Sequence, residues 1–318
     1  MRFDVCNGDA DGLCAALQWR LQHAGPVQLV TGLKRDIALL ERAPARPGDE
    51  VNVFDLSMQR NLEALQHLLD SGVRVRYFDH HAVDVIPVHA LLDAQIDGGR
   101  DVCTSLLVDR RLDGAHRAWA LVGAYGDNLT DVADRLAVDS GIDVAGRDVL
   151  RHLGEAINYN AYGEDEADVC VAPAQLYAIM VQYRDPWDMR SHEGVFAEMD
   201  ALRRSDLDRG RACPTHWQDA QASVRMLPDA PWSRRVIGCL GNELASADPQ
   251  RAHAVLRPQS DGGYLVSVRA PEGSRLEAQA FCRRFGGGGR AGSAGIEGLP
   301  SADLSRFLSA FAAAPWTR

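Results

Sequence analysis

Short apolar runs alternate with helical patterns through the first 80 residues, and this alternation limits the possible folds more than any other feature of the chain. The apolar runs predict strands at residues 3–6, 27–31, 51–54 and 73–78. Apolar residues at helical spacing predict helices over residues 12–24 and around 62–69, with Gly72 as a stop signal. Strands separated by helices of this length form βαβ units, so the sequence predicts a parallel sheet with helices on both faces.

The remainder of the chain predicts a second, smaller domain. Residues 104–125 and 149–183 are mostly helical in pattern, whereas residues 203–233 lose their periodicity. Beyond them we expect strands at residues 236–240, 252–256 and 262–269, and helices at 275–285 and 302–313. The predicted fold is therefore α/β, with a parallel-sheet domain (1–200), a linker (201–233) and a smaller α/β domain (234–318), separated by a cleft.

Charge and composition exclude several classes of protein. The net charge is −10, although residues 225–318 hold twelve arginines against eight acidic residues. Proteins that bind long duplex DNA carry a strongly basic surface, so we expect no such partner. No apolar run approaches the ~18 residues of a membrane span, and no secretory signal is visible. Seven cysteines without a Cys-x-x-Cys pair fit the reducing cytoplasm.

Acidic and imidazole side chains follow the predicted strands where these end. Asp9 and Asp11 follow the first strand, Asp55 the third, and Asp79-His80-His81 the fourth, while Asp127 follows a later helix. Ligands of parallel sheets bind at the carboxyl ends of the strands. Each feature alone has an ordinary explanation, such as an aspartate that caps a helix or a surface histidine. Together they favour a site for Mn²⁺ or Mg²⁺, because clustered carboxylates need a compensating cation.

The same residues, in this order and spacing, resemble the DHH phosphoesterase superfamily. Its members include RecJ exonucleases, oligoribonuclease/pAp phosphatases and manganese-dependent pyrophosphatases. The glycine tract at residues 286–295 is similar to the substrate-binding motif of the DHH-associated C-terminal domain. The resemblance therefore covers nearly the whole chain.

The resemblance implies a role for each matched residue. Two manganese ions, or magnesium ions, would be held by Asp9, Asp11, Asp55, His80 and Asp127, with Asp55 bridging them. His81 would face the substrate phosphate, and Asp79 would orient the histidines. In the C-terminal domain, Arg290 with the backbone around Gly288, Gly289 and Ser293 would bind a phosphate or a terminal group.

Two positions depart from the family pattern. Many members have a histidine where this chain has Asn7, which could supply an amide oxygen to the first ion instead. Arg290 replaces the histidine usual in the C-terminal motif, which keeps an anion contact but adds a permanent charge.

Further residues are candidates with an equally ordinary alternative. Lys34, the only lysine in the chain, and Arg35 could meet substrate phosphates or lie in solvent. Tyr159 could stack a nucleobase, or lie in an ordinary loop, and Asn128 is a further candidate for substrate contact. Thr104-Ser105 should begin a helix and could also touch the site. Cys14 and Cys103 are expected in the core and not as nucleophiles.

These features predict a hydrolase in which two metal ions activate a shared water for attack on a phosphoester. A short oligonucleotide or small nucleotide fits the acidic charge and the two-domain organisation better than a long strand does. A single-strand exonuclease, a pyrophosphate or polyphosphate hydrolase, and a nucleotide sensor without turnover are the alternatives. The protein could also form a homodimer.

Overall fold

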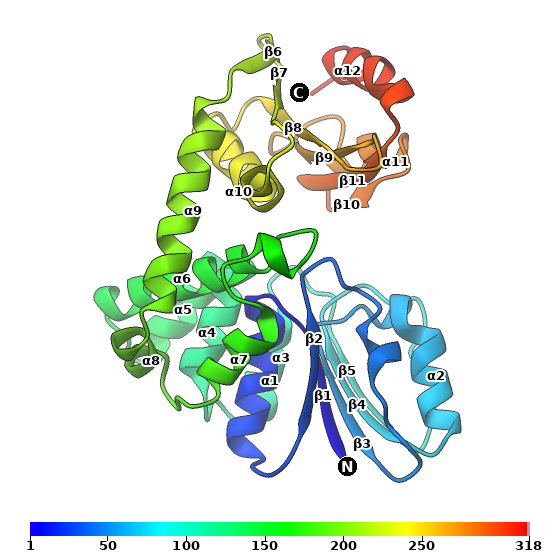
Figure 1. The fold of residues 1–318 in the computed structure, drawn as a ribbon, viewed down its shortest axis with the longest axis vertical. Helices are drawn as coiled ribbons and strands as arrows, with labels where there is room; N and C mark the ends of the chain where they lie inside the picture. Colours follow the sequence, from blue (N-terminus) through cyan, green and yellow to red (C-terminus); the bar gives the residue numbers. More distant parts are fainter. Residues whose placement is uncertain (317–318) are drawn as a thin grey trace. The chain divides into compact units, whose positions relative to one another are not determined.

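The computed structural model describes residues 1–316. It divides between Ala201 and Leu202 into two compact units, each with its own sheet (Figure 1). One sheet is parallel and the other is mixed, so the predicted α/β class is confirmed.

The first unit is built on a five-stranded parallel sheet of order β2-β1-β3-β4-β5. Its strands are β1 (Arg2–Asn7), β2 (Gln28–Gly32), β3 (Glu50–Phe54), β4 (Arg74–Asp79) and β5 (Leu92–Ile96). The sequence predicts the first four strands; it does not predict β5, whose residues are only partly buried at the edge of the sheet. Since all the strands are parallel, their carboxyl ends meet along one edge of the sheet.

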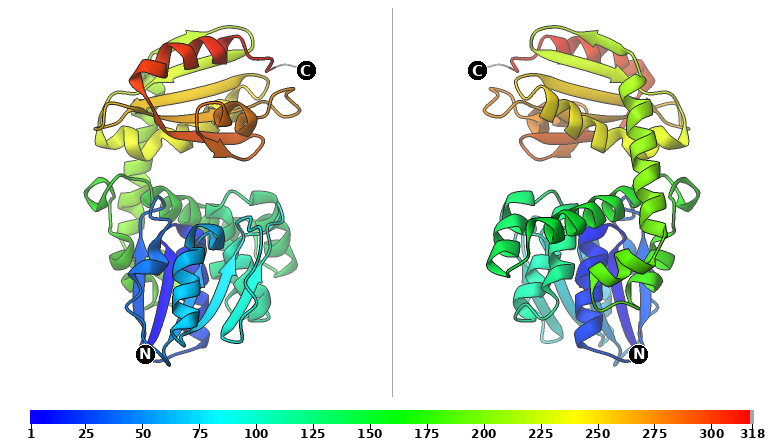
Figure 2. Two further views of the ribbon diagram at one scale, coloured as in Figure 1. Left: turned by 90° about the vertical axis from the view of Figure 1, so that its right-hand side faces the viewer. Right: turned by 90° about the vertical axis from the view of Figure 1, so that its left-hand side faces the viewer.

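Helices cover both faces of this sheet (Figures 1 and 2). The helices of this unit are α1 (Ala10–Gln22), α2 (Leu62–Asp70), α3 (Thr104–Arg111), α4 (Arg117–Gly126), α5 (Thr130–Asp139), α6 (Val144–Asn160), α7 (Pro173–Met180) and α8 (Pro186–His192). Alternate strand residues explain the two layers: Val5 and Val53 pack toward α2, whereas Cys6 and Phe54 pack toward α1 and α4. Within the described residues, no helix is both long enough and apolar enough to cross a bilayer.

The helix α9 (Val195–Ala212) runs across the division and leads into the second unit. That unit has a six-stranded sheet of order β10-β11-β9-β8-β7-β6. Its elements are β6 (Thr215–Gln218), β7 (Ala222–Met226), α10 (Pro231–Ala247), β8 (Ala252–Pro258), β9 (Tyr264–Arg269), α11 (Ala278–Arg283), β10 (Gly288–Gly289), β11 (Ser293–Leu299) and α12 (Leu304–Ala312). Helix α10 packs on one face of the sheet, while α11 and α12 pack on the other.

Two expectations for this region are wrong. Residues 236–240 form part of α10 and not a strand. Ser233, Val236, Ile237, Leu240 and Gly241 are buried at helical spacing, a pattern that a five-residue apolar window does not reveal. Residues 201–233 are not an irregular linker, because they contain the end of α9 and both β6 and β7.

Candidate metal centre

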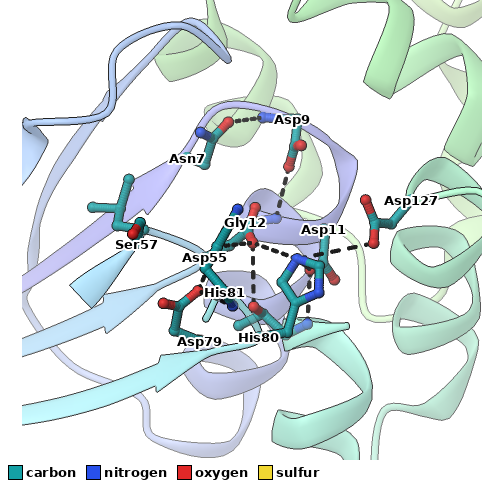
Figure 3. A network of polar contacts seen from close by, with 12 residues as sticks. Asn7, Asp9, Asp11, Gly12, Asp55, Ser57, Asp79, His80, His81 and Asp127 are labelled. Carbon is teal, nitrogen blue, oxygen red and sulfur yellow. Dashed lines mark hydrogen bonds and ion pairs between the residues drawn. The ribbon is translucent and has the colours of Figure 1, made fainter. Parts of the chain in front are cut away.

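Four chain segments bring polar side chains together at the carboxyl edge of the first sheet (Figure 3). Asp9 and Asp11 follow β1, Asp55 follows β3, and His80 follows β4. Asp127 comes from the carboxyl end of α4. All five side chains that the sequence predicts as metal ligands therefore lie in one group, although they come from segments far apart in the chain.

The two aspartates of the first loop are each fixed by a helix. Asp9 caps α1, since its Oδ1 accepts a hydrogen bond from Gly12 N (3.0 Å). Asp11 accepts hydrogen bonds from the backbone amides of Thr104 and Ser105 at 2.7 Å each, so it caps α3 from a distant part of the chain. The first amides of a helix lack partners within it, and a carboxylate satisfies them well. The predicted helix start at Thr104-Ser105 thus also serves to hold Asp11.

Asp55 occupies a strained backbone position. Its φ is 56°, in the left-handed region that residues other than glycine seldom adopt. The Asp55 amide donates to the carbonyl of Phe78 (3.0 Å), which holds the turn in place. Its Oδ1 lies 3.3 Å from His80 Nε2 and accepts a hydrogen bond from the Thr104 hydroxyl at 3.3 Å. Backbone strain of this kind concentrates at functional sites.

His80 is the centre of the group. Its Nδ1 lies 3.1 Å from the carbonyl oxygen of Val102, which orients the ring. Its Nε2 lies 3.3 Å from Asp55 and 3.9 Å from a carboxylate oxygen of both Asp11 and Asp127. A histidine fixed through one ring nitrogen, with the other turned toward carboxylates, has the arrangement of a metal ligand.

Asp127 reaches the site because α4 packs unusually closely on its neighbours. A Cβ atom at Gly126 would lie 2.3 Å from Ala10 Cβ, so only glycine fits there. The Oδ2 atom of Asp127 is buried and has no hydrogen-bond partner among the described residues. A buried carboxylate oxygen without a partner calls for a cation.

Asp79 and His81 form a second pair beside the cluster. Asp79 is fully buried and accepts hydrogen bonds from the amides of Met58 and His81, at 3.1 Å each. Its Oδ1 lies 2.6 Å from His81 Nδ1. The His81 side chain is 45% exposed, so its ring remains accessible. The sequence analysis expects Asp79 to orient both histidines; in the structure Asp79 contacts His81, whereas His80 Nδ1 lies against the carbonyl oxygen of Val102.

The electrostatics show that the cluster lacks positive charge. Burial and the charges of Asp9 and Asp11 raise the pKa of Asp55 well above its ordinary value, and burial and Asp11 raise the pKa of Asp127. Burial disfavours protonation of His80, but Asp55 and Asp11 outweigh it and raise the pKa of His80 to about 10. Protons therefore take up the charge that a divalent ion would otherwise balance.

Asp9 differs from the other carboxylates in having a basic partner. Lys34 forms an ion pair through Nζ with Asp9 Oδ2. Burial alone would raise the pKa of Asp9, but the charge and hydrogen bond of Lys34 lower it.

The predicted substrate-binding residues of the second unit form a hairpin. Gly288 and Gly289 make up β10 and pair with β11, which begins at Ser293. The Arg290 amide donates to Ser293 O (2.7 Å), and the Arg290 side chain is exposed. The hairpin needs glycine, because a Cβ at Gly289, whose φ is 145°, would lie 2.5 Å from Ala294 Cα.

Other candidates separate into accessible and buried residues. Arg35 and Asn128 are both exposed, and Asn128 has a left-handed backbone with a φ of 64°. Tyr159 is only 1% exposed, so a nucleobase cannot stack on its ring as the sequence analysis considered. Cys14 and Cys103 are fully buried with pKa values raised by burial, which fits their predicted place in the core.

Sequence analysis misses the residues that act through their position in the fold. Asn158 Oδ1 accepts a hydrogen bond from Lys34 Nζ (3.1 Å), and the Val102 carbonyl orients His80. Nothing in the local sequence marks these contacts, since they join segments far apart in the chain.

Comparison with known proteins finds likeness in structure and not in sequence. No protein-family model and no curated protein matches the chain. The solved structure of exonuclease RecJ bound to manganese matches with a TM-score of 0.63 and 17% identity, covering 99% of this chain and 91% of that one.

Two further structures match over nearly the whole chain. RecJ in complex with Mn²⁺ from Thermus thermophilus has a TM-score of 0.55 and 18% identity; the match covers 97% of this chain and about half (51%) of that one. The pGpG-specific phosphodiesterase PggH from Vibrio cholerae has a TM-score of 0.55 and 13% identity, covering 97% and 96%. The chain therefore shares the fold of RecJ and PggH, in agreement with the fold that the resemblance of its motifs implies.

Proposed function

We propose that this chain, with its DHH phosphoesterase fold, is a divalent-metal-dependent hydrolase of short oligonucleotides or small nucleotides. The observation that carries the proposal is the set of buried carboxylates around His80 Nε2, including the unpartnered Oδ2 of Asp127 within the described residues. A nucleotide sensor without turnover would have little need for these carboxylates, because their mutual repulsion destabilises the fold.

The donor set fits a divalent ion of the Mn²⁺ or Mg²⁺ type. Asp11, Asp55 and Asp127 offer oxygen atoms, and His80 offers one oriented imidazole nitrogen, a combination suited to Mn²⁺. Such an ion supplies Lewis-acid activation of water and neutralises charge on phosphoryl oxygens. The Mn²⁺ in the RecJ structures supports manganese as the ion.

The protein side chains position the substrate around this centre. His81 donates a hydrogen bond from Nδ1 to Asp79, so the protonated form of the accessible ring can also donate one from Nε2 to a phosphoryl oxygen. Val102 O fixes the orientation of His80. In the second unit, the exposed Arg290 guanidinium offers a fork of donors suited to an anionic oxygen. No protein nucleophile takes part in this scheme.

The substrate class is a small nucleotide for two reasons. The net charge of −10 disfavours long nucleic acid, and the match to a pGpG-specific phosphodiesterase covers 97% of this chain. RecJ, which also matches in fold, is an exonuclease, so exonuclease activity on a single strand is the second candidate. The seven free thiols fit a reducing compartment, and we place the activity in the cytoplasm.

A panel assay tests the proposal. Metal-free protein is titrated with Mn²⁺ and given a linear dinucleotide, pAp, a cyclic dinucleotide, pyrophosphate and a labelled single strand. We expect hydrolysis of the dinucleotide or pAp that depends on the metal. Tight nucleotide binding without turnover of any substrate would instead identify a sensor, and preferred cleavage of the strand would identify an exonuclease.

Removal of the Arg290 side chain tests the role of the hairpin. Loss of a charged hydrogen bond to the substrate should raise KM by about 10- to 100-fold with little change in kcat. The matched control is Arg283→Ala, which removes an exposed arginine from the neighbouring helix α11. A loss confined to kcat in Arg290→Ala would refute a binding role.

Asp79→Asn tests the positioning of His81. Partners that orient a histidine in this way typically contribute about 10- to 100-fold, and we expect kcat to fall by that factor. Burial lowers the pKa of His81, but the hydrogen bond and charge of Asp79 raise it above the ordinary value. NMR titration should therefore show a lower pKa of His81 in the variant. An unchanged pKa would show that Asp79 does not control this ring.

A further inference from the structure

Lys34 forms an ion pair with Asp9, which the family resemblance assigns to one of two metal ions. We propose that the Lys34 ammonium replaces that ion, so that the centre holds a single divalent cation beside a built-in monovalent one. This inference rests on the proposed function, and it differs from the two-ion arrangement that the family resemblance implies. The contacts of Asp9, Asn7 and Lys34 support it, because they contrast with those of the residues around His80.

The Asp9 carboxylate already has a cation as a partner, unlike Asp11, whose two oxygens accept only backbone amides. Its Oδ1 accepts a hydrogen bond from Gly12 N (3.0 Å) and caps α1, while its Oδ2 forms the ion pair with Lys34 Nζ. A metal ion bound through Oδ2 would place two cations on one oxygen. The Asp9 side chain is only 4% exposed, which leaves little room for both cations on one oxygen.

Asn7 is also engaged with its own surroundings. Its Oδ1 accepts a hydrogen bond from Asp9 N (3.1 Å), and its Nδ2 donates to the carbonyl of Lys34 (3.4 Å). The amide therefore helps to hold the lysine segment and to shape the Asp9 loop. An imidazole at this position could ligate a metal ion, whereas the Asn7 amide instead supports the lysine.

Three contacts with the end of α6 and the residues that follow it hold Lys34 in place. The Lys34 amide donates to Ala161 O (3.1 Å), and Nζ donates to Asn158 Oδ1 (3.1 Å). The ammonium also lies 5.6 Å from the centre of the Tyr162 ring, within reach of a cation–π interaction. A lysine bound by a carboxylate, an amide oxygen and an aromatic ring is a built feature of the site and not a solvated side chain.

The carboxylates around His80 have different contacts. Asp127 Oδ2 lacks a hydrogen-bond partner within residues 1–316, and His80 Nε2 faces three carboxylates at 3.3–3.9 Å. In the described part of the chain, the ion pairs of Asp55 and Asp127 are with the histidines and not with a lysine or arginine. The carboxylates around His80 therefore still lack a lysine or arginine partner, whereas Lys34 supplies a cation to Asp9.

An ammonium is suited to this position. Lysine is a compact charge with three donors, of which Asp9 and Asn158 take two. The third can bind a phosphoryl oxygen of the substrate. All other basic residues of the chain, apart from histidines, are arginines, whose planar five-donor head does not match a single-oxygen contact of this kind.

The stoichiometry of Mn²⁺ binding tests the inference. The metal-free chain is titrated with Mn²⁺ by calorimetry and equilibrium dialysis, for the wild type, Lys34→Met, Asp9→Asn and the control Arg35→Met. We expect one ion in the wild type, in Arg35→Met and in Asp9→Asn. We expect a second, weaker ion in Lys34→Met, because Asp9 Oδ2 is then free.

Each alternative outcome is distinct. Two ions in the wild type that fall to one in Asp9→Asn would overturn the inference and leave the proposed function intact. No bound ion in the wild type would overturn both the inference and the metal-dependent function.

Chemical labelling gives a second test that needs no variant. Lys34 is the only lysine, so an amine-acylating reagent followed by peptide mapping reports on this side chain alone. Saturating Mn²⁺ should leave its labelling rate unchanged, because the ion binds without displacing Lys34 from Asp9. A severalfold faster rate in the presence of Mn²⁺ would show displacement, and would overturn the inference.

Discussion

Asp55→Asn should lower kcat by about 10²- to 10⁴-fold, since charge stabilisation by a bound metal ion is worth several kcal/mol. Asp55 lies closer to His80 Nε2 than either Asp11 or Asp127 does, so it is the ligand most central to the cluster. Asparagine keeps the shape of the side chain and tolerates the φ of 56° at this position. The loss can therefore be attributed to the missing charge, measured as steady-state hydrolysis at saturating Mn²⁺.

The same substitution should weaken the pH dependence of the stability of the metal-free protein. Because burial and neighbouring carboxylates raise the pKa of Asp55, the folded state binds its proton more tightly than the unfolded state does. This group therefore lowers stability as pH rises from the ordinary value toward the raised one, and neutral asparagine removes that change. We expect the Tm without metal to fall less as pH rises, and a smaller rise in Tm on addition of Mn²⁺.

A matched control exists for this variant. Asp113 also has a left-handed backbone, with a φ of 50°, and it lies outside the cluster in the turn after α3. Asp113→Asn should leave both kcat and the response of Tm to Mn²⁺ unchanged. If Asp55→Asn retained wild-type turnover, Asp55 would not be part of the catalytic centre.

Mn²⁺ should bind more tightly as pH rises, and binding should release protons. Asp55 and the other carboxylates raise the pKa of His80 to about 10 against the burial that opposes protonation, so the ring is protonated at neutral pH. A metal ion requires the neutral imidazole and must displace this proton. Each proton displaced makes the apparent affinity rise about tenfold per pH unit below the pKa.

Stability of the metal-free protein should change in the opposite direction. A raised pKa of His80 stabilises the fold fully below the ordinary value of 6.5, and this contribution is lost as pH rises toward about 10.

Calorimetric titrations of the protein with Mn²⁺, in buffers of different ionisation enthalpy, measure the protons released on binding. His80→Gln should show a weaker pH dependence, and a pH-independent affinity in the wild type would contradict this assignment.

The predictable part of the fold is the part with regular periodicity. Strands β1, β3 and β4 have apolar runs that lead into Asn7, Asp55 and Asp79, so both the sheet and its functional edge follow from the sequence. In α10, by contrast, Val236–Leu240 is a short run of mostly apolar residues, and only burial over further turns distinguishes helix from strand. Strands β6 and β7 fall in a segment whose Arg, Asp and Pro content obscures the alternation of apolar and polar residues that marks a strand.

The candidate site divides in the same way. The aspartates at strand ends can be recognised in the sequence because they directly follow the predicted strands, and the structure brings them together. The pairing of Lys34 with Asp9, 25 positions away, and with Asn158, 124 positions away, depends on how α6 packs against α4 and α1. The burial of Tyr159 likewise comes from tertiary packing, since its local sequence is polar and resembles a loop.

Anomalous scattering from crystals of the metal-free protein soaked in Mn²⁺ is the sharpest test of the metal centre, because it locates the ion without assuming any activity. We expect an anomalous peak bonded to His80 Nε2 and to carboxylate oxygens of Asp55 and Asp127. Full occupancy by Mn²⁺ elsewhere on the protein, with no peak beside His80, would contradict it.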